Sequence, residues 1–168
     1  MEIRLAQVED AAAILALQKL AYQNTARLYD GPVISPMTQT LENLAADFER
    51  TIFLKMQTPQ QQIVGSVRGF QVGSTVFVER LIVDPSYQRR GIASALVQQF
   101  EAHFTDAQRF ELYAGEKNEQ AVRLCQKLGY RELKRERMNN RRTLIFMEKL
   151  VGAFAYPPAE PAKMRSFS

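Results

Sequence analysis

The residues with the clearest chemical meaning form a short loop near the middle of the chain. The loop, at positions 88–93, reads QRRGIA and follows an apolar run at 76–83. Apolar residues then recur at every fourth position up to Phe104, a pattern that predicts a helix with one buried face. The N–H groups at a helix start bind anions, and Gly91 and Ala93 leave room for a ligand to reach them. Arg89 and Arg90 add positive charge next to this helix start, so we predict a phosphate or pyrophosphate site here. The alternative is an ordinary solvated turn.

One carboxylate, Glu79, stands inside the apolar run before this loop. A charged group in the middle of an apolar strand is costly unless it is paired or used, so Glu79 is a candidate general base. The alternative is that Glu79 pairs with a basic side chain on an adjacent strand, such as Arg68. Regular alternation along a strand also predicts which neighbours share its face. On this pattern one face carries Phe77, Glu79, Leu81 and Val83, and the other carries Val78, Arg80 and Ile82.

A second strand and helix are predicted at 109–115 and 118–128. Asn118 is a favourable helix N-cap and Gly129 a favourable helix end. Within the helix, positions i, i+3, i+4 and i+7 form an apolar stripe, which consists of Ala121, Leu124, Cys125 and Leu128. This spacing favours a buried and inert Cys125.

Both segments resemble motifs of the Gcn5-related N-acetyltransferase (GNAT) family. The loop at 88–93 fits the family pattern Gln/Arg-x-x-Gly-x-Gly/Ala at every specified position, and it is the specific part of the resemblance. The second family motif is an asparagine followed by Ala-x-x-Leu-Tyr-x-x-x-Gly-Phe. It is matched or conservatively replaced at Asn118, Ala121, Leu124, Gly129 and Tyr130. Cys125 departs from the motif, because it stands where the family usually has the tyrosine that protonates the departing thiolate of coenzyme A.

The resemblance covers about residues 1–150 and implies a mixed α/β fold with a central, mostly antiparallel seven-stranded sheet flanked by about four helices. It also implies acetyl-coenzyme A as co-substrate. The backbone of Leu81, Ile82 and Val83 would pair with the pantetheine arm like an added strand. The pyrophosphate would be cradled by Arg89, Arg90, Gly91, Ile92, Ala93 and Ser94. Asn118 would reach the pantetheine or the phosphate side.

Acetyl transfer to an amine requires a base for the proton of the amine and a proton for the leaving thiolate. Glu79 is the predicted base. The candidates for the acid are Tyr113, Cys125 and water. We therefore predict an N-acetyltransferase in which a primary amine attacks the thioester directly, with no metal ion.

The expected acceptor is a small amine or an amino-acid-like molecule, with protein N-termini or lysines as the alternative. Aromatic side chains that are candidates for lining the amine pocket are Tyr22, Tyr29, Phe48 and Tyr113. Because Cys125 replaces the tyrosine usual in the family, an alternative function is a non-catalytic sensor that binds coenzyme A. A nucleic-acid-binding domain that uses the basic residues at 131–142 ranks lowest, since glutamates intersperse with them.

Composition is compatible with these expectations. The chain has 168 residues, of which 46% are hydrophobic, so we expect one domain at 1–150 and a proline-containing tail at 151–168. The net charge of +4 is too small to indicate nucleic acid by itself. One cysteine excludes an internal disulfide, and a single histidine argues against a zinc site. We expect a cytoplasmic protein without a membrane span, and the sequence leaves monomer and homodimer open.

The same patterns predict the order of the elements. Strands are expected at 2–7, 51–57, 62–72, 74–84, 109–115, 131–138 and 142–150. Helices are expected at about 9–29, 38–50, 90–104 and 118–128, with a break between the first two at 29–36. Gly73-Ser74 and Asn139-Asn140 are expected to link hairpins.

Overall fold

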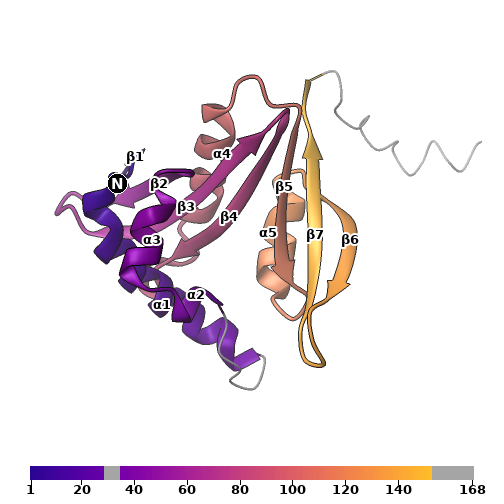
Figure 1. Cartoon of the computed structure of the whole chain (residues 1–168), viewed down its shortest axis with the longest axis horizontal. Coiled ribbons are helices and arrows are strands. Elements are labelled where there is room, and N and C mark those ends of the chain that lie inside the picture. The colour runs from indigo at the N-terminus through magenta and orange to yellow at the C-terminus, as the bar shows by residue number, and fades with distance from the viewer. Residues whose placement is uncertain (29–34, 153–168) are drawn as a thin grey trace, which may run out of the picture.

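The seven strands of the computed structural model form one sheet, in the order β1-β2-β3-β4-β5-β7-β6 (Figure 1). They are β1 Glu2–Leu5, β2 Ile52–Gln57, β3 Ile63–Val72, β4 Thr75–Val83, β5 Arg109–Gly115, β6 Arg131–Arg137 and β7 Thr143–Leu150. Neighbouring strands are antiparallel except β4 and β5, which are parallel. The expected mixed α/β fold with a mostly antiparallel seven-stranded sheet is confirmed.

Helices lie on both faces of this sheet (Figure 1). They are η1 Val8–Asp10, α1 Ala11–Leu28, α2 Ser35–Thr38, α3 Leu41–Asp47, η2 Pro85–Tyr87, α4 Ile92–His103 and α5 Glu119–Lys127. Residues of α1 and α3 share one core cluster, and residues of α4 and α5 share the other. The helix predicted at about 38–50 is present as the shorter α3, which begins after Thr40 because the Thr40 hydroxyl accepts a hydrogen bond from the Asn43 N–H. The short helix α2 before it was not predicted.

The structure describes residues 1–28 and 35–152. The predicted break at 29–36 therefore lies mostly outside the described residues, and so does the predicted tail beyond 152. Within the described ranges, no helix combines the length and the apolar character that a membrane span needs.

Helix α4 approaches β3 closely because the strand carries glycines where the helix crosses it. The predicted apolar stripe is buried, with Ile92, Leu96, Phe100 and Phe104 between 0% and 8% exposed. A Cβ at Gly65 would come within 2.9 Å of the Ile92 and Leu96 side chains. At Gly69 it would overlap the carbonyl oxygen of Phe77 and lie 2.8 Å from the Phe100 ring. These glycines set the position of α4, and hence of the loop that precedes it.

Strands β4 and β5 pair briefly and then separate. Their register runs from Thr75 opposite Arg109 to Phe77 opposite Glu111. β4 continues to Val83 and β5 to Gly115, and Figure 1 shows the two strands diverging beyond their common end. The edge of β4 that faces β5 is therefore not paired with β5 from 78 to 83, so its backbone groups are accessible to another extended chain.

Strand β4 contains a β-bulge next to Glu79. Arg68 pairs with Glu79 and Ser66 pairs with Ile82, so β4 has two residues between these pairs where β3 has one. Arg80, one of the two, has a φ of 51°. A non-glycine residue adopts this left-handed conformation at a cost, and strain of this kind concentrates at functional sites.

The bulge reverses the predicted alternation along β4. Residues that pair across strands project to the same face, so Glu79 and Ile82 share a face. Leu81 and Val83 instead pack against the core that α4 covers. The prediction that Glu79 shares its face with Leu81 and Val83 is wrong, because one inserted residue shifts the period of two. For Phe77, which precedes the bulge, the predicted face is correct.

Candidate active site

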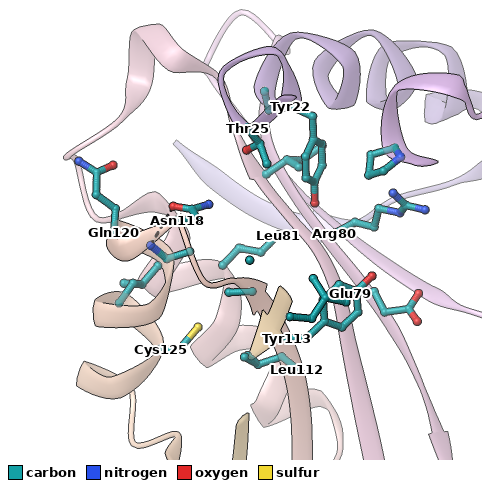
Figure 2. A pocket seen from close by; sticks show the side chains of 18 of the residues that line it. Tyr22, Thr25, Glu79, Arg80, Leu81, Leu112, Tyr113, Asn118, Gln120 and Cys125 are labelled. Atoms are coloured by element: carbon teal, nitrogen blue, oxygen red, sulfur yellow. Dashed lines mark hydrogen bonds between the residues drawn. The ribbon is translucent and has the colours of Figure 1, made fainter. Parts of the chain in front are cut away.

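A cleft of about 550 Å³ opens where β4 and β5 separate (Figure 2). β4 lines it from 78 to 83, β5 lines it from 112 to 115, and α1 and α5 contribute further walls. The predicted site residues that line it are Glu79, Leu81, Ile82, Val83, Tyr113, Asn118 and Cys125. The fold thus brings together residues from three separate segments of the chain.

Asn118 fixes the start of α5 at the wall of the cleft. Its side-chain oxygen accepts a hydrogen bond of 3.3 Å from the Ala121 N–H, which confirms the predicted N-cap. The predicted helix end is also correct, since Gly129 follows α5 with a φ of 98°.

The loop before α4 has the backbone geometry of an anion site. Arg89 and Gly91 both have positive φ, at 62° and 77°. Left-handed residues at a helix start form concave sites lined by N–H groups. A Cβ on Gly91 would meet no atom within 4 Å, so the space beside the loop is open. Arg90 lies over the Tyr87 ring at 4.8 Å, and Gln88 connects the loop to the cleft as one of its lining residues.

The first turn of α4 supplies the N–H groups of this site. The first helical hydrogen bond joins the Ala95 N–H to the Gly91 carbonyl at 3.0 Å. The N–H groups of Ile92, Ala93 and Ser94 therefore precede the helical ladder. Ile92 is 4% exposed and anchors the turn in the core, while Ala93 and Ser94 are half-buried.

Glu79 borders two cavities. It lines the cleft, and it also borders a second cavity of about 360 Å³ together with Asp47, Arg50, Thr51 and Phe70. Figure 2 shows its side chain leaving β4 beside Tyr113. The side chain is half-buried, and within residues 1–28 and 35–152 it forms no hydrogen bond or salt bridge.

Arg68 lies opposite Glu79 but is held by other groups. Its guanidinium donates a 3.1 Å hydrogen bond to Gln39 Oε1, lies 3.8 Å from the Asp47 carboxylate and packs 5.1 Å over the Phe53 ring. Its interaction with Glu79 is electrostatic, without a direct ion pair. The alternative prediction of a structural Arg68–Glu79 pair thus has the register it requires but lacks the contact.

The two candidate acids have different surroundings. Tyr113 is 44% exposed, and its ring lies 5.6 Å from that of Phe146. Cys125 is 5% exposed, and burial raises the pKa of its thiol to about 11. The thiol is therefore protonated at neutral pH and is a weaker acid than an ordinary cysteine thiol.

Comparison with known proteins identifies the family to which the chain belongs. The family model described as "Acetyltransferase (GNAT) family" matches residues 14–130, which include both strands of the cleft, the loop at 88–93 and α5. The chain belongs to the GNAT acetyltransferase family. The resemblance seen in the sequence is confirmed, and so is acetyltransferase as the class of enzyme. No curated protein sequence matches the chain.

Solved structures share the fold of this GNAT acetyltransferase. The smu.2055 protein from Streptococcus mutans UA159 is 21% identical, with a TM-score of 0.75 over 89% of this chain and 99% of that one. The PaiA N-acetyltransferase from Thermoplasma acidophilum, in complex with coenzyme A, is 17% identical, with a TM-score of 0.72 over 89% and 98%. YncA from Salmonella typhimurium, solved with its cofactor acetyl-CoA, is 20% identical, with a TM-score of 0.72 over 95% and 99%. At these identities the likeness is one of fold.

The aromatic residues expected around the amine divide into two groups. Tyr22 from α1 and Tyr113 from β5 both line the cleft of the acetyltransferase. Burial raises the pKa of Tyr22. Phe48 stacks on Phe53 at 3.9 Å and belongs to the core under α1 instead. Tyr29 lies outside the described residues.

Two lining residues of the acetyltransferase cleft, Arg80 and Arg142, were not among the site residues predicted from the sequence. Arg80 was assigned to the face opposite Glu79, because nothing in the sequence announces a bulge. Arg142 belongs to the terminal hairpin, which pairs with β5 only through the tertiary fold. Among the described residues, no group of three or more His, Cys, Asp or Glu is placed to hold a metal ion.

Proposed function

We propose that this acetyltransferase moves the acetyl group of acetyl-coenzyme A to the primary amine of a small, amino-acid-like molecule, by direct attack of the amine on the thioester. The observation that carries the proposal is the position of Glu79. Glu79 lines the same cleft as the open edge of β4, and the loop at 88–93 follows that strand after the short helix η2. A candidate base, an open strand edge for an extended arm and a candidate phosphate site therefore lie on β4 and on the loop that follows it in the chain.

Acetyl-coenzyme A is the co-substrate of this family, and the cleft fits its parts. The backbone of Leu81, Ile82 and Val83 lies on the open edge of β4, where an extended amide chain can pair with it. The segment from Arg89 to Ser94 offers N–H groups and two exposed guanidinium groups to a pyrophosphate. When bound, the co-substrate supplies a thioester carbonyl for attack. Asn118 holds α5 against the same cleft.

Glu79 is the proposed general base. An amine is protonated at neutral pH and must lose a proton before its nitrogen can attack. Glu79 faces the cleft, where the amine arrives, and it borders the second cavity beside Asp47. The proton can therefore leave on the side away from the thioester.

Tyr113 is the proposed donor of the proton to the leaving thiolate, with water as the alternative. Its side chain lines the cleft, and Figure 2 shows it between Glu79 and Leu112. Cys125 is the weaker candidate, because its raised pKa of about 11 makes proton donation to an ordinary thiolate unfavourable. We assign Cys125 to the wall of the cleft.

Thiol release from acetyl-coenzyme A tests the proposal. Calorimetry first measures binding of coenzyme A, and the purified chain is then assayed with separate pools of amino acids, simple amines, polyamines, aminoglycosides and short peptides. We expect release with a pool of small molecules. Tight binding without release from any pool would contradict the proposal, and release with peptides alone would move the acceptor to protein termini or lysines.

Glu79→Gln tests the assigned base. The amide keeps the shape of the side chain but cannot accept the proton, so kcat is expected to fall by a factor of about 10²–10⁴. The KM for acetyl-coenzyme A should change little, because Glu79 lies outside the anion-binding loop. Glu9→Gln makes the same chemical change at an exposed position and serves as the control. An unchanged kcat for Glu79→Gln with every acceptor would sink the assignment.

We further propose that the enzyme works in the cytoplasm as a domain spanning residues 1–150. Sedimentation of the full chain with and without coenzyme A would test whether it forms a homodimer.

A further inference from the structure

The walls of the cleft come from different helices. Figure 2 shows Tyr22 and Thr25 on the α1 side of the cleft and Asn118 and Cys125 on the α5 side. The proposed donor site lies along the open edge of β4 and at the loop before α4, so the walls from α1 and α2 are left to face the acceptor. Helix α2 contributes Pro36 to the lining. The position of α2 therefore bears on how an acceptor lies in the cleft.

Helix α2 is held by a buried glutamine of α1. Gln18 is 0% exposed, and its Nε2 donates a 2.7 Å hydrogen bond to the Pro36 carbonyl oxygen. The same Nε2 donates at 3.0 Å to Gln39 Oε1, in the turn between α2 and α3. Because α2 is a single short turn, Ser35–Thr38, it depends on such contacts for its position. The Gln18 amide thus ties the wall at Pro36 to Gln39.

The Gln39 amide uses all of its hydrogen-bonding positions. Its Oε1 accepts from Gln18 Nε2 and, at 3.1 Å, from Arg68 Nη2 of β3. Its Nε2 donates to Asn43 Oδ1 at 2.7 Å and to Asp47 Oδ2 at 2.9 Å, both on α3. A side-chain amide has two donor hydrogens and two acceptor lone pairs, and these four bonds use them. The reversed amide would turn its NH₂ group toward the donors of Gln18 and Arg68, so the network selects one orientation.

Arg68 connects this network to the strand of the proposed base. It pairs in register with Glu79 across β3 and β4, so the two side chains project to the same face of the sheet. Arg68 is 3% exposed, and its guanidinium contacts Gln39, the Phe53 ring at 5.1 Å and the Asp47 carboxylate at 3.8 Å. A buried charge is costly unless it is hydrogen-bonded and paired, so these contacts fix its position. The network therefore runs from the α2 wall of the cleft to the cross-strand neighbour of Glu79.

We infer that Gln39 is a positioning residue of the acetyltransferase. Through Gln18 and Arg68, its amide holds the α2 wall of the cleft against the strands that carry Glu79, and so sets where the amine of the acceptor lies relative to the base. Gln39 lies outside the lining of the cleft and takes no part in the bond changes. The inference rests on the proposed function, because it assigns the α2 side of the cleft to the acceptor.

Gln39→Leu tests the inference, with thiol release from acetyl-coenzyme A measured for individual amino acids, alkylamines, spermidine and dipeptides. Leucine is of similar size and makes none of the hydrogen bonds of the Gln39 amide. We expect KM for the acceptors that the wild type uses to rise by about 3- to 10-fold, the effect of one lost neutral hydrogen bond, while KM for acetyl-coenzyme A stays within about twofold. A merely structural role would lower the fraction of active enzyme and would move neither KM.

Two further variants separate the halves of the network. Asn43→Ala is the matched control, because it removes one partner of the Gln39 amide at an exposed position of α3 and leaves the bonds to Gln18 and Arg68. Its KM for the acceptor should equal that of the wild type even if its stability falls. Gln39→Glu keeps an oxygen that accepts from Gln18 and Arg68 but cannot donate to α3. Its KM for the acceptor should therefore lie closer to the wild type than that of Gln39→Leu.

Thermal unfolding shows which variants fold. If Gln39→Leu does not fold, Gln18→Met carries the test with the same expected result, because it removes the bond to the Pro36 carbonyl oxygen. A KM for the acceptor within about twofold of the wild type in the folded variant would overturn the inference and leave the proposed function standing. An equal rise of this KM in Asn43→Ala would do the same. Failure of the wild type to use any of the acceptors would overturn both.

Discussion

At the scale of single residues, one irregularity in β4 places Glu79, the proposed base, and its neighbour Arg80. The bulge at Arg80 puts the Glu79 side chain on the face opposite Leu81 and Val83. A regular strand would turn Glu79 and Leu81 to the same face. The strained φ of Arg80 therefore accompanies the change of face between the proposed base and the residues that follow it.

Cys125 is expected to be dispensable for catalysis. Cys125→Ala removes the thiol but keeps a small apolar residue that favours helix. Because the raised pKa makes this thiol a poor proton donor, kcat should stay within about threefold of wild type, far from the factor of 10²–10⁴ expected for loss of a general acid. Steady-state kinetics with the best acceptor measure this. A fall of that larger size would return Cys125 to the role of acid.

The raised pKa of the Cys125 thiol predicts that the free energy of unfolding falls at alkaline pH. Its pKa is about 11 in the folded protein and about 9 in the unfolded chain. The raised value stabilises the fold fully below pH 9, and this contribution is lost as the pH rises toward 11, because the unfolded thiol ionises first. Between pH 8 and 10.5 the wild type should lose about 2 kcal/mol more unfolding free energy than Cys125→Ala. Parallel urea titrations of the two proteins give the difference, and identical pH profiles would refute the shift.

At the scale of elements, the anion-binding loop depends on backbone conformation as much as on charge. Gly91 has a φ of 77° in open space, so Gly91→Ala meets no clash but strains the backbone. Straightening the loop would misdirect the N–H groups at the start of α4. We expect KM for acetyl-coenzyme A to rise about tenfold, with little change in KM for the acceptor. Gly73→Ala, at a φ of 62° in the β3–β4 hairpin, is the matched control and should leave both KM values unchanged.

Elements with a strong local signal could be predicted from the sequence, and elements set by distant contacts could not. The apolar residue at every fourth position, Phe100 among them, predicted α4, and Asn118 and Gly129 predicted the two ends of α5. Periodicity and caps are local properties, so a sequence shows them directly. The short helix α2 and the exact start of α3 were missed, since a hydroxyl cap such as Thr40 also occurs inside loops. The bulge at Arg80 was missed because it is defined by register against β3. Residues of the candidate site could therefore be predicted within single segments of the chain. Arg80 and Arg142 were found only in the folded structure, where these segments lie side by side.

At the scale of the whole molecule, the two halves of the sheet are joined behind the cleft by Glu101 of α4. Its carboxylate accepts a 2.7 Å hydrogen bond from the Tyr130 hydroxyl and pairs at 2.9 Å with Lys149 of β7. Burial and the charge of Glu101 raise the pKa of Tyr130, which keeps its hydroxyl protonated as the donor. α4 packs on the strands before the separation, and β7 pairs with β5 after it. One carboxylate thus links the parts of the fold that diverge at the cleft.

Removing this link should loosen the cleft as well as the fold. Glu101→Ala leaves a buried hydroxyl and a half-buried ammonium group without their acceptor, so the free energy of unfolding should fall by about 2–4 kcal/mol. Glu101→Gln keeps an acceptor oxygen for the Tyr130 hydroxyl but loses the charge, so the free energy of unfolding should fall by less than in Glu101→Ala. The proposed anion-binding loop precedes α4, and β5 forms the opposite wall of the cleft, so KM for acetyl-coenzyme A should rise more in Glu101→Ala than in Glu101→Gln. The exposed Glu49→Ala is the control and should change neither the free energy of unfolding nor this KM. Urea unfolding and steady-state kinetics on the three variants measure both. A loss of stability without any change in KM would mean that β4 and β5 hold the cleft open by themselves, and that Glu101 serves only the packing behind them.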